Sequence, residues 1–186
     1  MAQTTSNRDR RHRHRSMSSH RGKIHDGDGD NQATKAERFR AVVAVHLLLL
    51  RDQEVLLLRR ANTGYEDGNY SVIAGHLDGN ETASQAMARE AFEEAGIIVA
   101  PADLRFVHVM HRKEAVEADE RIDLFFAATR WQGEPEIGES EKCSELRWSP
   151  LSALPTNMVP YVRAALGHYR QQQAYAEFWL PAAPRS

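Results

Sequence analysis

The chain is poor in the features that would place it in several protein classes. It has one cysteine, Cys143, among 186 residues, so an internal disulfide or a cysteine-rich zinc site is excluded. Its longest apolar run, 41–50, covers ten residues and is interrupted by His46, whereas a helix that spans a bilayer needs about 20. The 24 Lys and Arg nearly balance the 26 Asp and Glu, which gives no overall attraction to nucleic acid. Secreted, membrane-bound and disulfide-stapled classes are therefore disfavoured, and we expect a cytoplasmic protein.

Charge is unevenly distributed along the chain. Residues 1–40 carry ten Lys and Arg against five Asp and Glu, whereas the remainder carries 14 against 21. Residues 1–36 contain almost no large apolar side chain, so we predict a disordered basic tail there. Its Arg and His cluster at 10–15 could touch nucleic acid or phosphates, although a solvated tail fits the pattern better. No apolar stretch follows these arginines, so we expect no secretory signal, and translation could start at Met17.

The rest of the sequence alternates apolar strands with amphipathic helices. The predicted strands are 41–50, 54–59, 71–74, 104–112, 122–130 and 145–149, and the predicted helices are 83–95 and 160–174. Because strands outnumber helices and a run of strands separates the two helices, we predict an α/β fold, with helices packed on the faces of a central mixed β-sheet. This domain would cover 37–175, and 176–186 would form a C-terminal tail.

The helix at 83–95 has recognisable ends. Thr82 followed three residues later by Gln85 is a capping box, and Gly96 can adopt the positive φ of a C-terminal cap. The apolar positions that recur at helical spacing, and that we expect to face the core, are Ala88, Ala91, Phe92 and Ala95.

Three glutamates lie on roughly the opposite face of this helix. Glu90, Glu93 and Glu94 follow an i, i+3, i+4 spacing, which places their carboxylates about 5–6 Å apart. At an effective dielectric constant of about 20, each pair repels by about 3 kcal/mol. A solvated acidic face is the simplest interpretation, but bound cations would also relieve the repulsion. Hard oxygen ligands without cysteine or paired histidine favour Mg²⁺ or Mn²⁺ over zinc.

The glutamates belong to a longer pattern. The segment matches the Nudix box, G-x5-E-x7-R-E-U-x-E-E-x-G-U, at all its fixed letters: Gly75, Glu81, Arg89, Glu90, Glu93, Glu94 and Gly96. At a frequency near 7% for each letter, the chance of this match is on the order of 10⁻⁸ per starting position. From about residue 40 to 166 the chain resembles the Nudix hydrolase superfamily, which implies a Nudix-type α/β/α sandwich.

The resemblance implies roles for the box residues. The implied metal ligands are Glu90, Glu93, Glu94 and the carbonyl oxygen of Ala74. Arg89 would hold the glutamates in place by ion pairing, and Glu81 would act through water or on a second ion. One carboxylate would be the general base, with Glu93, Glu90 and Glu139 as candidates, because the assignment varies within the family.

The loop before the helix departs from the commonest family pattern. It ends in Ala74-Gly75 where Gly-Gly is usual, and Asn80 replaces a later glycine. Neither change removes an implied ligand, since Ala74 would contribute a carbonyl. Gly75 counts among the implied substrate-binding residues.

Three further matches resemble the MutT-type branch of the family. Arg60 ends a strand ahead of the box, where it would meet a substrate phosphate or lie in solvent. Glu139 ends the pattern R-W-x-G-E-P-x-x-x-E and would reach the metal or act as base, with Glu141 as substitute and a solvated loop as alternative. Asn157 would bind a purine, although a turn or capping role is at least as plausible.

The implied function is a Mg²⁺-dependent diphosphatase. We expect cleavage of a nucleoside triphosphate, for example oxidised dGTP, to monophosphate and pyrophosphate. Dinucleotides, nucleotide sugars and ADP-ribose are alternatives, as is a non-catalytic nucleotide-sensing module, against which the intact glutamates argue. Tyr65 and Tyr70 could stack on a base or pack their loop. The expected partner is a small-molecule nucleotide without membrane or nucleic acid, and the sequence leaves the oligomeric state open.

Overall fold

The computed structural model describes residues 38–114 and 119–179, and the predicted tail at 1–36 lies outside them. The elements in chain order are β1 (Val42–Arg51), β2 (Glu54–Arg60), β3 (Tyr70–Ser71), β4 (Ile73–His76), α1 (Ala83–Ala95), η1 (Pro101–Asp103), β5 (Arg105–Lys113), β6 (Arg121–Ala128), β7 (Cys143–Pro150), α2 (Pro160–Arg170) and β8 (Tyr175–Trp179). Each predicted strand and helix has a counterpart, with ends that differ by a few residues.

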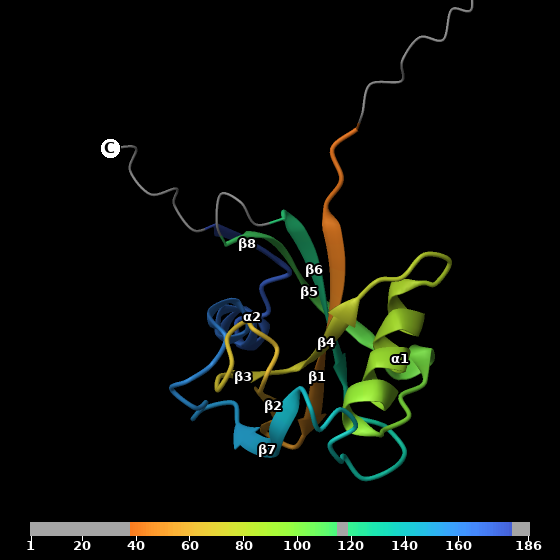
Figure 1. The fold of residues 1–186 in the computed structure, drawn as a ribbon, viewed down its shortest axis with the longest axis vertical. Helices are drawn as coiled ribbons and strands as arrows, with labels where there is room; N and C mark the ends of the chain where they lie inside the picture. Colours follow the sequence, from red (N-terminus) through yellow and green to blue (C-terminus); the bar gives the residue numbers. More distant parts are fainter. Residues whose placement is uncertain (1–37, 115–118, 180–186) are drawn as a thin grey trace, which may run out of the picture. The chain divides into compact units, whose positions relative to one another are not determined.

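The sheet is mixed, as predicted, and β1 lies at its centre (Figure 1). β1 pairs in parallel with β6 and antiparallel with β4, while its end forms a hairpin with β2. β2 also pairs with β3 and β7, and β5 joins β6 to the edge strand β8. The antiparallel pairing of β1 with β4 places Ala74 opposite His46 and Gly75 opposite Val45, which fixes the start of the Nudix box in the sheet.

The helices cover opposite faces of the sheet and each closes a separate apolar cluster (Figure 1). α1 contributes Ala86, Met87, Ala91 and Ala95 to one cluster. α2 contributes Tyr161, Val162, Ala165 and Leu166 to the other. The predicted α/β/α sandwich is therefore confirmed. Within the described ranges, no helix combines the length and the apolar character that crossing a bilayer requires.

The ends of α1 agree with the sequence. The Thr82 hydroxyl accepts a hydrogen bond from the backbone N–H of Gln85, and the Gln85 side chain accepts one from the Thr82 N–H, which completes the capping box. Gly96 has φ = 65°, and its N–H donates to the carbonyl of Phe92. These caps fix where the helix begins and ends.

The prediction that Phe92 faces the core is wrong. Its side chain is 60% exposed, whereas Met87 and Ala91 are completely buried. Met87, Ala91 and Ala95 follow an i, i+4, i+8 row, and Phe92 lies about 100° around the helix from Ala91. The prediction for Ala91 and Ala95 is confirmed, and the buried side of α1 extends from them toward Met87 and away from Phe92.

The C-terminal boundary also differs from the prediction. α2 ends at Arg170, and the chain then turns through Gln172, which has φ = 56°. The next residues form β8, which pairs in parallel with β5. The tail predicted to begin at residue 176 therefore starts inside a strand of the sheet. Hydrogen bonds to the open edge of β5, such as that from the Val109 N–H to the Ala174 carbonyl, order this segment.

Candidate active site

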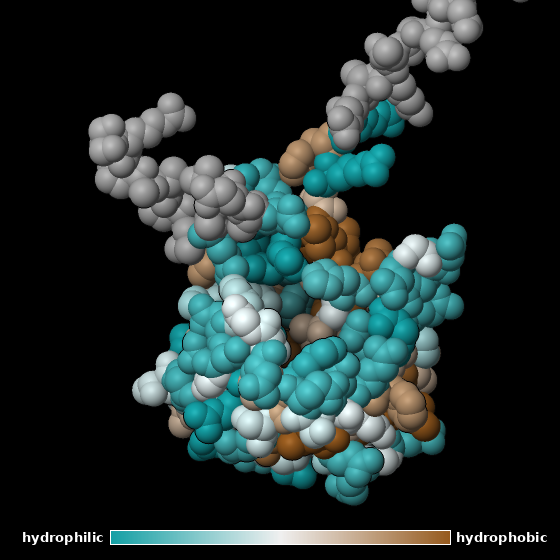
Figure 2. Space-filling view, in the orientation of Figure 1, coloured by the Kyte–Doolittle hydropathy of each residue, from teal (hydrophilic) through white to brown (hydrophobic). Residues whose placement is uncertain are grey.

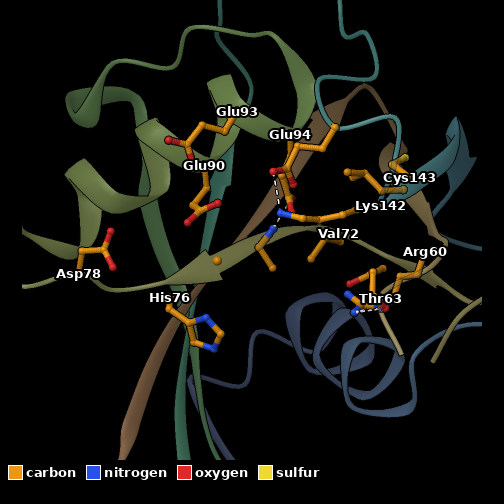
Figure 3. Close-up of a pocket in the computed structure, with 15 residues that line it drawn as sticks. Arg60, Thr63, Val72, His76, Asp78, Glu90, Glu93, Glu94, Lys142 and Cys143 are labelled. Atoms are coloured by element: carbon orange, nitrogen blue, oxygen red, sulfur yellow. Dashed lines mark hydrogen bonds and ion pairs between the residues drawn. The ribbon is translucent and has the colours of Figure 1, made fainter. Parts of the chain in front are cut away.

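A cavity of about 420 Å³ opens where α1 passes over β4 (Figure 3). Its acidic lining residues are Asp78, Glu90, Glu93, Glu94 and Glu139, and its cationic ones are Arg60 and Lys142. In the space-filling view the molecule is hollowed on this face, and hydrophilic residues border the hollow (Figure 2). Carboxylates from separate segments thus share one cavity.

Glu94 reaches from α1 back to β4. Its Oε2 accepts a hydrogen bond of 2.9 Å from the backbone N–H of Ala74. Burial of the carboxylate raises the pKa of Glu94 to about 8, and the nearby charges of Glu90 and Glu139 act in the same direction. The hydrogen bond from Ala74 and the charge of Arg60 oppose this shift. Additional positive charge near Glu94, such as a bound cation, would therefore favour the ionised form of this carboxylate.

Glu90 lies directly against the backbone of Gly75. A Cβ on Gly75 would come within 1.9 Å of both Cδ and Oε1 of Glu90, so a larger residue would displace the carboxylate. Burial raises the pKa of Glu90, partly offset by its ion pair with Arg89. The first glycine of the Nudix box is thus required by close packing against one of the box glutamates.

Arg89 is the hub of the acidic cluster. Its guanidinium contacts Glu81 at 2.9 Å, Glu90 at 2.7 Å and Glu93 at 3.0 Å, and it donates to the His76 carbonyl at 3.1 Å. These contacts link α1 to β4 and to the loop between them. The delocalised guanidinium can serve several carboxylates at once, which a lysine ammonium does less well.

Glu139 comes to the cavity from the loop between β6 and β7. The loop packs against the end of α1, because the Gly138 N–H donates to the Glu94 carbonyl at 3.0 Å and a Cβ on Gly138 would lie 2.0 Å from the Glu93 carbonyl oxygen. Lys142 from the same loop contacts Glu139 at 2.7 Å and lines the cavity. Lys142 and Gly138 are not among the residues predicted from the sequence, although their proximity to Glu139 along the chain was a usable signal.

Arg60 lines the cavity opposite α1, at the end of β2. Its Nε donates to the Tyr65 carbonyl at 2.8 Å, and its Nη2 donates to the Thr63 hydroxyl at 2.9 Å. Arg60 therefore holds the loop that follows β2 and also presents positive charge toward the acidic wall.

Asn157 is not brought together with the other predicted site residues. Its side-chain N–H₂ donates to the Gly68 carbonyl at 2.8 Å, and Asn157 does not line the cavity. This contact ties the segment before α2 to the loop after β2. Tyr70 is buried, and its hydroxyl donates to Glu145. Of its two predicted roles, packing against its surroundings therefore fits better than stacking on a base.

The carboxylates that line the cavity supply oxygen ligands, which suit hard divalent cations such as Mg²⁺ and Mn²⁺, although His76 and Cys143 line it as well. In the part of the chain that the structure describes, no three acidic, histidine or cysteine side chains are gathered as a preformed metal cluster. Arg89 holds Glu90 and Glu93 instead, and Lys142 holds Glu139. The carboxylates still fit a divalent cation, because burial raises the pKa of Glu94, and also that of Glu90 despite its ion pair with Arg89.

Comparisons with known proteins agree with this geometry. The family model described as "NUDIX domain" matches residues 39–169. The crystal structure of a MutT NUDIX hydrolase from Burkholderia pseudomallei is 26% identical, covers 69% of this chain and 98% of its own, and superposes with a TM-score of 0.64. A NUDIX hydrolase from Nitrosomonas europaea is 21% identical, with coverage of 79% and 82% and a TM-score of 0.64.

A third similar structure belongs to a larger protein. The bifunctional NMN adenylyltransferase/ADP ribose pyrophosphatase from Francisella tularensis, complexed with AMP and an Mn ion, is 19% identical. The alignment covers 75% of this chain and 44% of that protein, with a TM-score of 0.56. The match of the family model to most of the chain, together with these folds, shows that the chain belongs to the Nudix hydrolase family and is a hydrolase of the MutT-like kind.

Proposed function

We propose that the protein is a Mg²⁺-dependent diphosphatase that cleaves a nucleoside triphosphate to the monophosphate and pyrophosphate. The observation that carries this proposal is the convergence of Glu90, Glu94 and Glu139 on a cavity that also contains Arg60. A diphosphate brings negative charge to an already acidic site, so it can bind only with added cations, which the oxygen donors suit.

The residues that would hold the metal are Glu90, Glu93, Glu94 and the carbonyl oxygen of Ala74. Bound Mg²⁺ or Mn²⁺ would neutralise the diphosphate oxygens and lower the pKa of an attacking water. The manganese in the Francisella tularensis protein is consistent with this assignment.

The chain's own residues orient these groups. Arg89 would keep Glu90 and Glu93 turned toward the cavity, because its 2.7 Å and 3.0 Å contacts restrict both side chains. Gly75 would leave room for the Glu90 carboxylate and for close approach of a phosphate to the backbone. Arg60 would bind a phosphate oxygen at the side of the cavity away from α1.

Proton transfer from the attacking water requires a carboxylate that is not locked in an ion pair with Arg89. Glu139 meets this condition, since its observed partner is Lys142, whose side chain is 56% exposed. We therefore assign Glu139 as the general base, because the other two candidates, Glu93 and Glu90, are both paired with Arg89.

The proposal is tested by separating the nucleotide products by ion-exchange chromatography after incubation with nucleoside triphosphates, dinucleotides, nucleotide sugars or ADP-ribose, each with Mg²⁺ and with EDTA. We expect Mg²⁺-dependent turnover of a triphosphate and release of pyrophosphate. Glu93→Gln should lower kcat by at least about 100-fold with a thermal midpoint within a few degrees of wild type. The matched control is Glu134→Gln, which changes an exposed glutamate outside the cavity.

Two results would contradict the proposal. If turnover in EDTA were as fast as turnover with Mg²⁺, the reaction would not depend on a metal ion. If ADP-ribose were cleaved faster than any triphosphate, the protein would be an ADP-ribose diphosphatase, and only the proposed substrate would be wrong.

A further inference from the structure

A second cavity adjoins the catalytic one. It has a volume of about 500 Å³ and shares Arg60, Ala74, Gly75 and His76 with the first cavity. Arg60 and His76 lie below the acidic wall on the side away from α1 (Figure 3). A substrate with its diphosphate at the glutamates can therefore extend past β4 into this second cavity without leaving the protein.

Tyr65 lines the second cavity and is partly exposed to solvent. Its side chain is 40% exposed, so it is not packed into the core. It projects from the loop that follows β2, whose backbone is held by Arg60 through the Tyr65 carbonyl. The Arg60 guanidinium also lies 5.4 Å from the centre of the Tyr65 ring. Tyr65 thus neighbours the arginine assigned to the phosphates.

The Tyr65 ring is held in place by a chain of charged contacts. Its hydroxyl donates to Glu114 at 2.6–2.7 Å, and Glu114 contacts Arg112 at 3.0 Å. Arg112 is buried and contacts Asp123 at 2.5 Å, and Asp123 contacts His46 at 3.2 Å. A ring anchored in this way loses little conformational freedom when a ligand packs on it, which favours binding.

The interior of the second cavity offers an unused polar group. Tyr161 lines it and is 93% buried, since only 7% of the residue is exposed. Within the described residues its hydroxyl has no hydrogen-bond partner, although the Arg112 guanidinium lies 3.8 Å from its ring centre. The cavity therefore combines an exposed aromatic wall with a hydrogen-bonding interior.

We propose that Tyr65 is a specificity-determining residue: its ring stacks on a planar heterocycle carried by the diphosphate, and so selects nucleotide substrates over phosphates that carry no planar ring. A flat ring with a polar edge satisfies both the aromatic wall and the Tyr161 hydroxyl. A phosphate without such a ring would leave the Tyr65 ring without a planar partner. This inference rests on the proposed nucleotide substrate and names the residue that recognises its ring.

The test compares two ligands that share the phosphates but differ in the ring. Binding of an α,β-methylene nucleoside triphosphate and of imidotriphosphate is measured by calorimetry with Mg²⁺ for the wild-type protein and its Tyr65→Leu and Tyr65→Phe variants. Because stacking of a base on an aromatic side chain changes affinity by about 10- to 100-fold, Tyr65→Leu should weaken nucleotide binding by that factor. Imidotriphosphate binding should change less than about twofold, and Tyr65→Phe should restore most of the nucleotide affinity.

Tyr175→Leu is the matched control. Tyr175 is also exposed and also donates its hydroxyl to a glutamate, Glu177, but it lies on β8 and lines neither cavity. This variant should bind both ligands as the wild type does.

The outcomes separate this inference from the proposed function. If the wild type binds both ligands and Tyr65→Leu leaves nucleotide binding unchanged, or weakens both ligands equally, the specificity role is overturned while the enzyme assignment stands. If the wild type binds neither ligand, the proposed function fails, and this inference fails with it.

Discussion

Glu94→Gln should stabilise the metal-free protein at alkaline pH, although it removes a proposed metal ligand. In the folded chain the Glu94 carboxylate is enclosed between α1 and β4, which raises its pKa from 4.5 to about 8. The native state therefore keeps a proton that the unfolded chain releases above about pH 4.5. The sign follows from linkage: stability falls as pH rises from about 4.5 toward 8, because the native state binds more protons over this range.

The size of the effect follows from the pKa shift. A shift of about 3.5 units corresponds to at most about 5 kcal/mol, at about 1.4 kcal/mol per unit. The Glu94 side chain retains some solvent contact, so we expect about half of this, 2–3 kcal/mol. A neutral glutamine can keep the hydrogen bond from the Ala74 N–H and avoids the ionisation penalty. For a domain of this size, the thermal midpoint should then rise by about 4–10 °C at pH 8.

The assay is thermal unfolding in EDTA from pH 5 to 8.5, with wild type, Glu94→Gln and the exposed control Glu134→Gln. The midpoint difference between Glu94→Gln and wild type should be small near pH 5 and grow toward pH 8. Saturating Mg²⁺ should stabilise wild type more than Glu94→Gln, because the ion binds the ionised carboxylate. A difference that stays constant across this pH range would refute the assigned burial of the Glu94 charge.

Two further substitutions test the packing of the site and the helix that carries it. Gly75→Ala should lower kcat by at least about 10-fold with little change in thermal midpoint, because the new Cβ would displace the flexible end of Glu90, found at 1.9 Å. The equivalent change at Gly79, where a Cβ meets nothing, should leave kcat unchanged, and equal effects of the two would contradict this reason. Thr82→Ala removes the cap of α1 and should cost about 0.5–2 kcal/mol of unfolding free energy, measured by urea denaturation, with kcat retained. An unchanged denaturation midpoint would show that the capping box adds nothing to stability.

The sequence alone determined the elements that depend on local physics. The two ends of α1 were predictable because a capping box and a C-terminal glycine act within a few residues, and Thr82, Gln85 and Gly96 behave as their types predict. The mixed sheet followed from the order of strands and helices along the chain. The acidic cluster was predictable because the spacing of Glu90, Glu93 and Glu94 is set by the helix itself.

Only the tertiary structure decided which side of α1 is buried and which distant residues join the site. Phe92 is exposed because the docking angle of α1 on the sheet, which helical periodicity does not define, selects the row through Met87 and Ala91. Asn157 meets Gly68 and not the cavity, because that contact depends on how two loops meet. The charged chain from Tyr65 to His46 joins β1, β5, β6 and a loop, segments far apart in the sequence. Long-range pairing of strands brings these charges together, and local sequence patterns do not predict that pairing.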